Sequence, residues 1–355
     1  MAKQLMKGNE AIAEAAIQAG CRFFFGYPIT PQNQIPEYMA RRMPQIGGCF
    51  LQAESELAAI NMVYGAAGAG ARVMTSSSSP GISLKQEGIS YIAGAELPCV
   101  IVNIMRAGPG LGGIQPGQSD YFQATKGGGH GDYRNVVLAP ASVEEAVQLT
   151  MRAFDLADRY RNPVMVIGDG MLGQMMEPVD MGEYIAPADL PAKDWAATGW
   201  DGKRKRAIIN SLWLDPDELE QHNRDIQAKY VLIKEKETLC ESYLTEDAEI
   251  VISAYGTMAR IARAAVDEVR KQGIKAGIIR PITVWPFPNQ VYYDVAAQDS
   301  VKQFLVIEMS SGQMIEDVKI SVNGQKPVTF HGRMGGIVPG VKEIIEVIKA
   351  RKGAL

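Results

Sequence analysis

Strand-length segments that are almost entirely apolar, separated by helix-forming segments, constrain the fold of this chain more than any other feature. Residues 98–105 read PCVIVNIM and residues 163–168 read PVMVIG, without the polar–apolar alternation of a strand that has one face in solvent. Strands that are apolar on both faces are typical of parallel sheets that helices cover on both sides. The alanine-rich residues 56–67 predict one such helix, and the capping-box sequence SVEE at 142–145 opens another. The first half of the chain therefore predicts a doubly wound, parallel α/β sheet.

This pattern is interrupted once and then resumes at residue 250. Between about residues 186 and 247, Pro, Trp and charged residues become frequent, and one amphipathic helix is predicted. The apolar positions of that helix are Leu219, Ile226, Tyr230, Ile233 and Cys240. A chain of 355 residues is long enough for two or three domains of about 150 residues each. We therefore predict a first α/β domain at 1–190, a linker with one amphipathic helix at 191–247, and a smaller α/β domain at 248–355.

Composition and charge argue against several classes of protein. The net charge is −4, and there is no basic stripe with interleaved aromatic residues, so nucleic acid is not an expected partner. No segment approaches the roughly 18 apolar residues of a membrane span, and the N-terminal residues lack the apolar core of a signal peptide. We expect a cytoplasmic protein that does not bind a membrane. Near its start, Asn9 is predicted to cap a helix that stops at Gly20.

Cysteine and histidine usage gives little support for a metal site. The four cysteines are scattered and form no C-x-x-C pair, which does not indicate a disulfide framework or an iron–sulfur site within this chain. With only three histidines in the sequence, a histidine-based metal site is not expected either. His130, in GGGHGD at 127–132, is either a functional residue in a cleft or an ordinary loop residue.

Two glycine motifs are similar to known phosphate-binding sequences. The sequence GPGLGG at 108–113 follows a strand, but it continues with IQPGQSD, which is typical of a loop and not of a helix that faces a pyrophosphate. Gly168-Asp169-Gly170 matches the first half of the Mg-diphosphate motif of thiamine enzymes. The asparagine that the motif requires is missing, because the next one, Asn210, is too distant. We interpret this motif as a turn, and the chain alone is not expected to hold a diphosphate.

Two charged residues are candidates for a site. Glu56 stands at the start of a predicted helix, where a carboxylate either complements the helix dipole or serves a site, and Glu54 is equally available on this evidence. Arg106 ends the strand at 98–105, at the edge where open α/β sheets bind ligands. It could bind a carboxylate through two hydrogen bonds, and the alternative is an ordinary surface arginine.

Taken together, the segments resemble the 2-oxoacid:ferredoxin oxidoreductases over nearly the whole chain. The similarity is closest to the alpha-type subunit of the members that act on 2-oxoisovalerate and 2-oxoglutarate. The matching segments, in the family's order, are GYPITP at 26–31, ESE at 54–56 with GAAG at 65–68 and TSSSSPG at 75–81, NIMR at 103–106 with the glycine loop to 120, and EMSSGQ at 308–313.

The resemblance implies an architecture and a set of partners. The first domain would be of the thiamine-diphosphate-binding type and would hold the pyrimidine end of that cofactor, and the second would be transketolase-C-terminal-like. A beta subunit would supply the diphosphate site, Mg²⁺ and a [4Fe–4S] cluster. A gamma subunit, a ferredoxin-like delta subunit and ferredoxin would be further partners, with coenzyme A as the acyl acceptor. No residue is assigned to coenzyme A.

The resemblance also implies roles for individual residues. Glu56, preferred to Glu54 for its spacing to the glycines that follow, would bind N1′ of the aminopyrimidine ring. Pro28, Ile29 and Thr30 would contact the cofactor. Thr30 and Arg106 would orient the carboxylate and oxo groups of the substrate.

The implied activity is the oxidative decarboxylation of a 2-oxoacid to acyl-CoA and CO₂, with electrons passing to ferredoxin. A branched-chain acid such as 3-methyl-2-oxobutanoate is preferred as the substrate, and 2-oxoglutarate is the alternative. Two further interpretations are a non-catalytic scaffold subunit and a thiamine enzyme of another type, such as a 2-oxoacid dehydrogenase or a transketolase.

Overall fold

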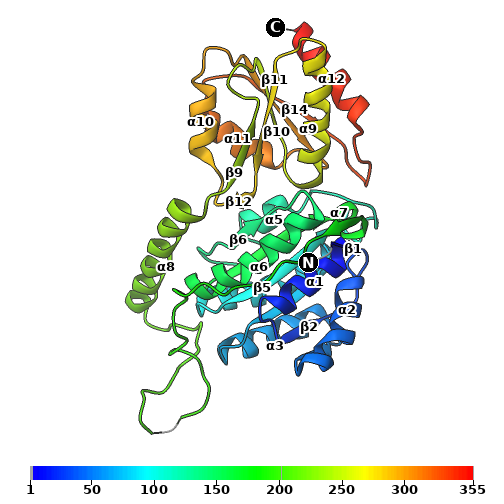
Figure 1. The fold of residues 1–355 in the computed structure, drawn as a ribbon. Helices are drawn as coiled ribbons and strands as arrows, with labels where there is room; N and C mark the ends of the chain where they lie inside the picture. Colours follow the sequence, from blue (N-terminus) through cyan, green and yellow to red (C-terminus); the bar gives the residue numbers. More distant parts are fainter. Residues whose placement is uncertain (1–2, 201, 355) are drawn as a thin grey trace.

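The computed structural model describes residues 3–200 and 202–354, which form two α/β units stacked end to end (Figure 1). The first unit is built on a seven-stranded sheet that is parallel except for one edge strand, β12, which runs antiparallel to β6. This arrangement confirms the predicted parallel sheet. Its strands, in spatial order, are β12 (Thr283–Trp285), β6 (Val136–Leu138), β7 (Pro163–Asp169), β5 (Cys99–Met105), β4 (Val73–Ser77), β2 (Phe23–Gly26) and β3 (Cys49–Gln52).

Both faces of this sheet are buried, because successive residues of its central strands enter two different hydrophobic clusters. In β5, Val100 and Val102 pack into one cluster, whereas Ile101 packs into the other. The first cluster includes residues of α1 (Gly8–Gln18), α2 (Gln34–Arg42) and α6 (Val143–Tyr160), and the second those of α3 (Glu56–Gly68) and α4 (Pro80–Gly94). The apolar strand sequences thus reflect helices on both sides.

The second unit has a five-stranded sheet, parallel except for the antiparallel pair β11–β9. Its strands, in spatial order, are β14 (Val328–Gly332), β13 (Gln303–Glu308), β10 (Ile250–Ser253), β11 (Ala276–Pro281) and β9 (Cys240–Tyr243). Helices α9 (Gly256–Lys271) and α12 (Val341–Gly353) pack into a hydrophobic cluster of this unit. Helices α10 (Asn289–Ala296) and α11 (Met314–Val322) pack into the hydrophobic cluster that also contains α3 and α4. One hydrophobic core therefore runs from the first unit into the second.

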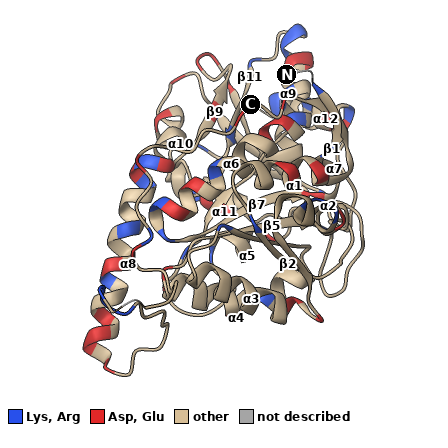
Figure 2. Ribbon diagram, turned by 60° about the horizontal axis from the view of Figure 1, so that its bottom comes forward, with Lys and Arg blue, Asp and Glu red and all other residues tan. Residues whose placement is uncertain are grey.

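The chain crosses between the units at two places that the sequence does not reveal. Strand β9 comes from the predicted linker and joins the second sheet, and β12 lies far along the chain and joins the first. Cys240, which was expected on the amphipathic helix, is the first residue of β9, so that expectation was wrong. The helix itself, α8 (Pro216–Glu237), buries Ile226, Tyr230 and Ile233. Figure 2 shows Lys, Arg, Asp and Glu interspersed along it.

The start of the chain pairs β1 (Gln4–Lys7) with β8 (Met176–Val179) as a separate antiparallel ribbon. Helix α1 begins at Gly8, so Asn9 lies inside the helix and does not cap it. Its side chain is buried and donates to the carbonyl of Pro31 and to Gln34. The expectation was wrong because this asparagine serves a tertiary contact.

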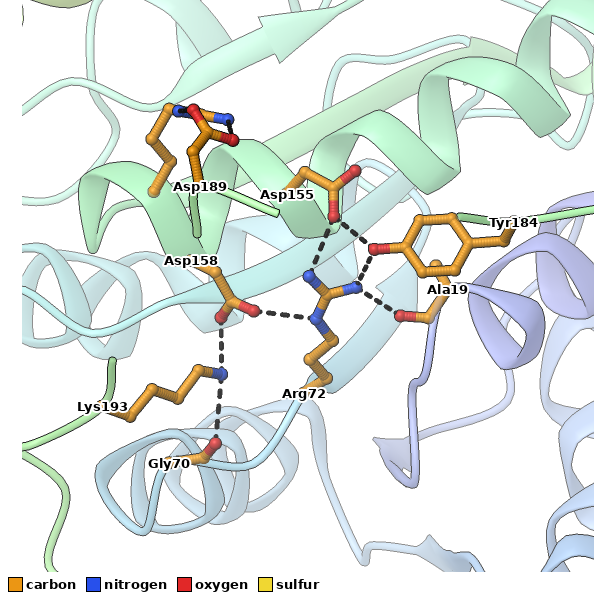
Figure 3. A network of polar contacts seen from close by, with 9 residues as sticks. Ala19, Gly70, Arg72, Asp155, Asp158, Tyr184, Asp189 and Lys193 are labelled. Carbon is orange, nitrogen blue, oxygen red and sulfur yellow. Dashed lines mark hydrogen bonds and ion pairs between the residues drawn. The ribbon is translucent and has the colours of Figure 1, made fainter. Parts of the chain in front are cut away.

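An extended segment, residues 180–200 and 202–215, leads from β8 to α8 and carries no helix or strand (Figure 1). A cluster of ion pairs and hydrogen bonds around Arg72 holds its first part against the sheet (Figure 3). The Arg72 guanidinium pairs with Asp155 and Asp158, both at 2.8 Å, and Lys193 of the segment pairs with Asp158 at 2.6 Å. Tyr184 of the segment accepts from Arg72 at 2.7 Å and donates to Asp155. No helix among the described residues is long and apolar enough to cross a membrane.

Candidate functional site

The predicted site residues lie at one edge of the first sheet, beyond the carboxyl ends of adjacent parallel strands. Thr30 follows β2, Glu56 follows β3, and Arg106 follows β5. Ligands of open α/β sheets bind at this edge, because the strand–helix turns there leave backbone amides and side chains free.

Glu56 is a buried carboxylate whose oxygens have no hydrogen-bond donor among residues 3–200 and 202–354. It is the first residue of α3, and Ser55 caps the helix by accepting from the amide of Ala58 at 3.1 Å. The Glu56 residue is 6% exposed, whereas Glu54 is exposed to solvent. The Glu56 oxygens are not among the fully enclosed polar atoms that lack a partner, so a donor from outside the chain can reach them. Glu56 is thus the one of the two acids that is set up for a ligand.

Gly81, in the first turn of α4, makes room for the Glu56 carboxylate. A β-carbon at this position would lie 2.6 Å from Oε1 of Glu56 and 2.0 Å from Oγ of Ser77. The hydroxyls of Ser77 and Ser78 are also buried, and neither has a hydrogen-bond partner within the described chain. Three polar groups with unused hydrogen-bonding capacity therefore gather around the start of α4.

Ser79 connects this group to Arg106, and sequence reasoning did not identify it. Its φ of +26° is a backbone conformation that L-residues rarely adopt, and such strain gathers at functional sites. The Ser79 hydroxyl donates to Asp120 at 2.6 Å and accepts from the amide of Arg106 at 3.0 Å. Asn103 accepts from the amide of Ser79 at 3.1 Å and donates to Asp120 at 2.9 Å. The signal in the sequence was Asn103 itself, a polar residue within an apolar strand.

Asp120 is nine-tenths buried at the centre of these contacts. Burial raises the pKa of its carboxyl above the ordinary value, while the hydrogen bonds from Ser79 and Asn103 and the charge of Arg106 lower it. The result is a rigid polar support beneath the Arg106 backbone.

Arg106 and Thr30 are in direct contact. The Arg106 side chain donates from its two terminal nitrogens to the carbonyls of Thr30 and Leu111, both at 2.9 Å. Its Nε is buried and unpaired, and the guanidinium forms no salt bridge with the described residues. A buried cation without a carboxylate partner can bind an anion. The Thr30 hydroxyl accepts a long hydrogen bond, 3.4 Å, from Asn33.

Lys85, which sequence reasoning also missed, lies one helical turn beyond Gly81 on α4. It is fully buried, and its Nζ donates to Oγ1 of Thr75 at 3.0 Å. Burial lowers the pKa of Lys85 to about 7, and the opposing effect is the charge of Glu56. The sequence ISLKQEG gives no indication that this lysine is buried, because lysine on a helix is usually exposed.

A cavity of about 900 Å³ opens between the two units, next to Ser79 and the loop that follows Arg106; Thr30, Glu56 and Arg106 are not among its lining residues. This volume suits a small-molecule ligand. The first unit contributes Ser79, Pro80, Ser83, residues 107–110, Ser119, Asp120 and Gln123, and the second contributes Met309, Ser310, Ser311, Gln313, Met334 and Gly335.

The loop that lines this cavity is tied to the second unit by Gln118. The amide of Gln118 donates to the carbonyl of Met309 at 2.9 Å, and its Oε1 accepts from the amide of Met309 at 3.0 Å. The Nε2 of Gln118 donates to the carbonyl of Tyr255 at 2.9 Å, and the hydroxyl of Tyr255 donates to the carbonyl of Gln118 at 3.1 Å. Glu308 shapes the facing loop by accepting from the amides of Gln313, Met314 and Ile315.

The remaining motifs have structural explanations. Asp169 of the Gly-Asp-Gly motif is buried and caps the short helix α7 (Gly170–Gln174), accepting from the amides of Met171 at 2.9 Å and Leu172 at 3.2 Å. His130 is exposed, with its ring edge-on to Tyr91. Within the described ranges, no three His, Cys, Asp or Glu side chains gather as a metal site would require.

Two family models match this chain. The model for the thiamine-diphosphate-binding part of pyruvate flavodoxin/ferredoxin oxidoreductases matches residues 14–207. The model for core domain II of pyruvate:ferredoxin oxidoreductase matches residues 248–344. Both segments of the chain with strong strand–helix patterns are thus covered.

Individual relatives are similar along their whole length. The ketoisovalerate oxidoreductase subunit VorB of Methanothermobacter thermautotrophicus is 52% identical, over 99% of this chain and 99% of its own. The 2-oxoglutarate synthase subunit KorA of the same organism is 37% identical, over 97% of both chains.

Two solved structures are similar in fold. The 2-oxoglutarate:ferredoxin oxidoreductase from Magnetococcus marinus, with 2-oxoglutarate, coenzyme A and succinyl-CoA bound, superposes with a TM-score of 0.86 at 26% identity. The match covers 98% of this chain and 65% of that one. A split-gene transketolase, an inactive β4 tetramer, gives a TM-score of 0.61 at 12% identity over 97% of both chains, which shows the fold alone.

Proposed function

This chain belongs to the 2-oxoacid:ferredoxin oxidoreductase family, as a subunit of a multi-subunit enzyme, and we propose that it presents Glu56 to the aminopyrimidine ring of thiamine diphosphate. The observation that carries this proposal is the buried Glu56 carboxylate, which lies at the carboxyl edge of the sheet without a donor of its own. Protonated N1′ of the ring is the donor that it lacks.

The residues of the site fit the pyrimidine end of this cofactor better than its diphosphate end. Glu56, Ser77 and Ser78 offer unused hydrogen-bonding groups around the glycine at the start of α4. Asp169, by contrast, already uses its carboxylate as a helix cap. We therefore assign the diphosphate and its Mg²⁺ to a beta subunit.

The side chains of this chain bind and orient the reacting molecules. When bound, thiamine diphosphate supplies the nucleophile that attacks the 2-oxoacid. Glu56 would accept the hydrogen bond from N1′, and Pro28 and Ile29 would contact the ring. Arg106 has its guanidinium fixed by two backbone carbonyls, so its remaining N–H groups can receive the substrate carboxylate without reorganisation. The Thr30 hydroxyl faces the same substrate.

The cavity favours a branched-chain 2-oxoacid such as 3-methyl-2-oxobutanoate. Within the described chain, its lining contains the apolar side chains of Ala107, Pro109, Met309 and Met334 and no Lys or Arg. A second carboxylate, as in 2-oxoglutarate, would find no lysine or arginine among these lining residues to pair with it. The higher identity to the ketoisovalerate enzyme subunit, 52% against 37%, supports the same substrate.

Electron transfer is assigned to other chains. All four cysteines are free, and within the described residues no three His, Cys, Asp or Glu side chains gather as a metal site would require. We propose that beta, gamma and ferredoxin-like delta subunits carry the [4Fe–4S] clusters, pass electrons to ferredoxin and complete the site for coenzyme A.

The test is viologen reduction by the co-expressed complex, with coenzyme A, against a panel of 2-oxoacids. Fastest turnover with 3-methyl-2-oxobutanoate supports the branched-chain assignment, and fastest turnover with 2-oxoglutarate overturns it without affecting the role of Glu56. The variant Glu56→Gln should lose more than about 100-fold in kcat, whereas Glu54→Gln, two residues away and exposed, should remain near wild type. Near-normal turnover of assembled Glu56→Gln complex contradicts the assignment of Glu56.

A further inference from the structure

Lys85 occupies a position between two close contacts of α3 and α4. A β-carbon at Gly81 would meet the Glu56 carboxylate, and one at Gly88 would lie 2.5 Å from Cγ2 of Ile60. Gly81, Lys85 and Gly88 are spaced four and three residues apart and share one face of α4, just as Glu56 and Ile60 share one face of α3. Lys85 is therefore held in the layer between the two helices, one turn from the proposed cofactor-binding acid.

The surroundings of Lys85 contain little to stabilise an ammonium. Its one hydrogen bond to a described residue goes to Thr75 of β4, and the residue is 0% exposed. Ser77, also on β4, is neutral, and Ile82 and Ile89 on α4 belong to the hydrophobic cluster of this face. Two other acids lie nearby: Asp120, which bonds Ser79 and Asn103 at the start of α4, and Glu87, which bonds Tyr91.

Glu56 is the charge that acts on Lys85. Burial lowers the pKa of Lys85 to about 7, and the Glu56 carboxylate is the group that opposes this by favouring the ammonium. A fully buried lysine that only filled space would be replaced at lower cost by an apolar residue of similar volume.

We propose that Lys85 is a positioning residue that acts through Glu56. Its ammonium compensates the Glu56 carboxylate when no cofactor is bound, and it gives up its proton when the aminopyrimidine ring takes over that charge. The inference rests on the function proposed for Glu56.

Protons balance in this exchange. When N1′ binds, one proton from solvent is taken up and shared between Glu56 and N1′, so the pair becomes neutral overall. Lys85 then loses the charge that favoured its ammonium, and its proton leaves to solvent. The proton that is gained equals the proton that is lost, and the number of charges buried with the cofactor does not increase.

The test is calorimetric titration of thiamine diphosphate into the cofactor-free complex with Mg²⁺. It is repeated in two buffers of different ionisation enthalpy, which gives the number of protons taken up without any measurement of turnover. At about pH 6, where Lys85 carries its proton, Lys85→Met complex should take up about one proton more per site than wild type. At about pH 8, where Lys85 is neutral, the two complexes should take up the same number.

A matched control is Lys229→Met. Lys229 of α8 is also a largely buried lysine whose pKa is lowered by burial, but its partner is Glu96 and not Glu56. Its substitution should leave the proton count at the wild-type value at both pH values. Lys85→Gln, which keeps a polar group at this position, provides the same comparison if the methionine variant does not assemble.

The outcomes separate the two proposals. Equal proton uptake by wild type and both Lys85 variants at the lower pH overturns the role of Lys85 and leaves that of Glu56 intact. Binding that is equally tight in Glu56→Gln complex overturns the proposed function, and with it this inference.

Discussion

Gly81→Ala is the substitution for which the structure predicts a loss of activity most directly. The new methyl group would lie 2.6 Å from Oε1 of Glu56 and 2.0 Å from Oγ of Ser77, whereas carbon–oxygen contacts in proteins are rarely shorter than about 3.4 Å. The carboxylate must therefore move by about 1 Å. A displacement of this size at a reacting group costs on the order of 100-fold in rate, or about 2.7 kcal/mol of transition-state stabilisation.

The stability of the protein should change much less than its activity. Crowding in a packed interior costs about 1–3 kcal/mol, and the replacement of a helical glycine by alanine returns roughly 0.5–1 kcal/mol. The assay is steady-state viologen reduction by the assembled complex, with thermal unfolding measured on the same preparation. We expect kcat to fall about 100-fold while the complex remains folded.

Two other glycines separate crowding from the displacement of Glu56. Gly88→Ala crowds the same pair of helices against Ile60, and Gly65→Ala, in α3, meets nothing within 4 Å. Gly88→Ala should lose stability but keep most of its activity, and Gly65→Ala should keep both. If Gly81→Ala stays within about threefold of wild type, or Gly88→Ala loses as much activity, the reasoning from the Glu56 contact is refuted.

Three further predictions follow from buried charges. Lys85→Met should raise thermal stability most below pH 7, and this gain should vanish toward pH 10.5. The fall in the pKa of Lys85 from 10.5 to about 7 corresponds to about 5 kcal/mol, because between these pH values only the unfolded wild-type chain holds the lysine proton. A gain that is independent of pH in fluorimetric melts contradicts this. Arg106→Lys cannot keep both carbonyl contacts and Nε, so KM for the 2-oxoacid should rise at least about tenfold in steady-state assays, and an unchanged KM would remove Arg106 from the substrate site. Glu308→Gln replaces an oxygen that accepts from backbone amides with an NH₂ group that can only donate. The loss should lower the free energy of unfolding by about 2–3 kcal/mol and increase hydrogen exchange at residues 313–315. Unchanged exchange at these residues would contradict the prediction.

The parallel sheet and the position of the site could be predicted from local sequence. The strands at 98–105 and 163–168 are apolar because helices cover both faces, and this pattern is visible without a structure. Arg106 follows a predicted strand, which places it at the ligand-binding edge of a parallel sheet, whereas the strand before Glu56, β3, was not predicted. The family's spacing favours Glu56 over Glu54, and the structure adds that Glu56 is buried beside Gly81 whereas Glu54 is exposed.

Features that depend on tertiary packing could not be predicted. A lysine on a helix is usually exposed. Lys85 is buried because glycines of α4 let α3 approach closely. Asn9 has the residue type of a helix cap, yet its amide binds the carbonyl of Pro31. The pairing of β12 with β6 joins residues more than a hundred positions apart, and apolar periodicity does not indicate which sheet a strand enters.

The four hydrogen bonds of Gln118 make the cavity wall a joint between two bodies. The backbone amide of Gln118 donates to Met309 and its side-chain oxygen accepts from Met309, as a neighbouring strand would, so the end of the loop that follows Arg106 is fastened to the second unit. A change in the angle between the units must either break these bonds or carry the loop with it. The width of the cavity therefore depends on the angle between the two units, because residues of both units line it.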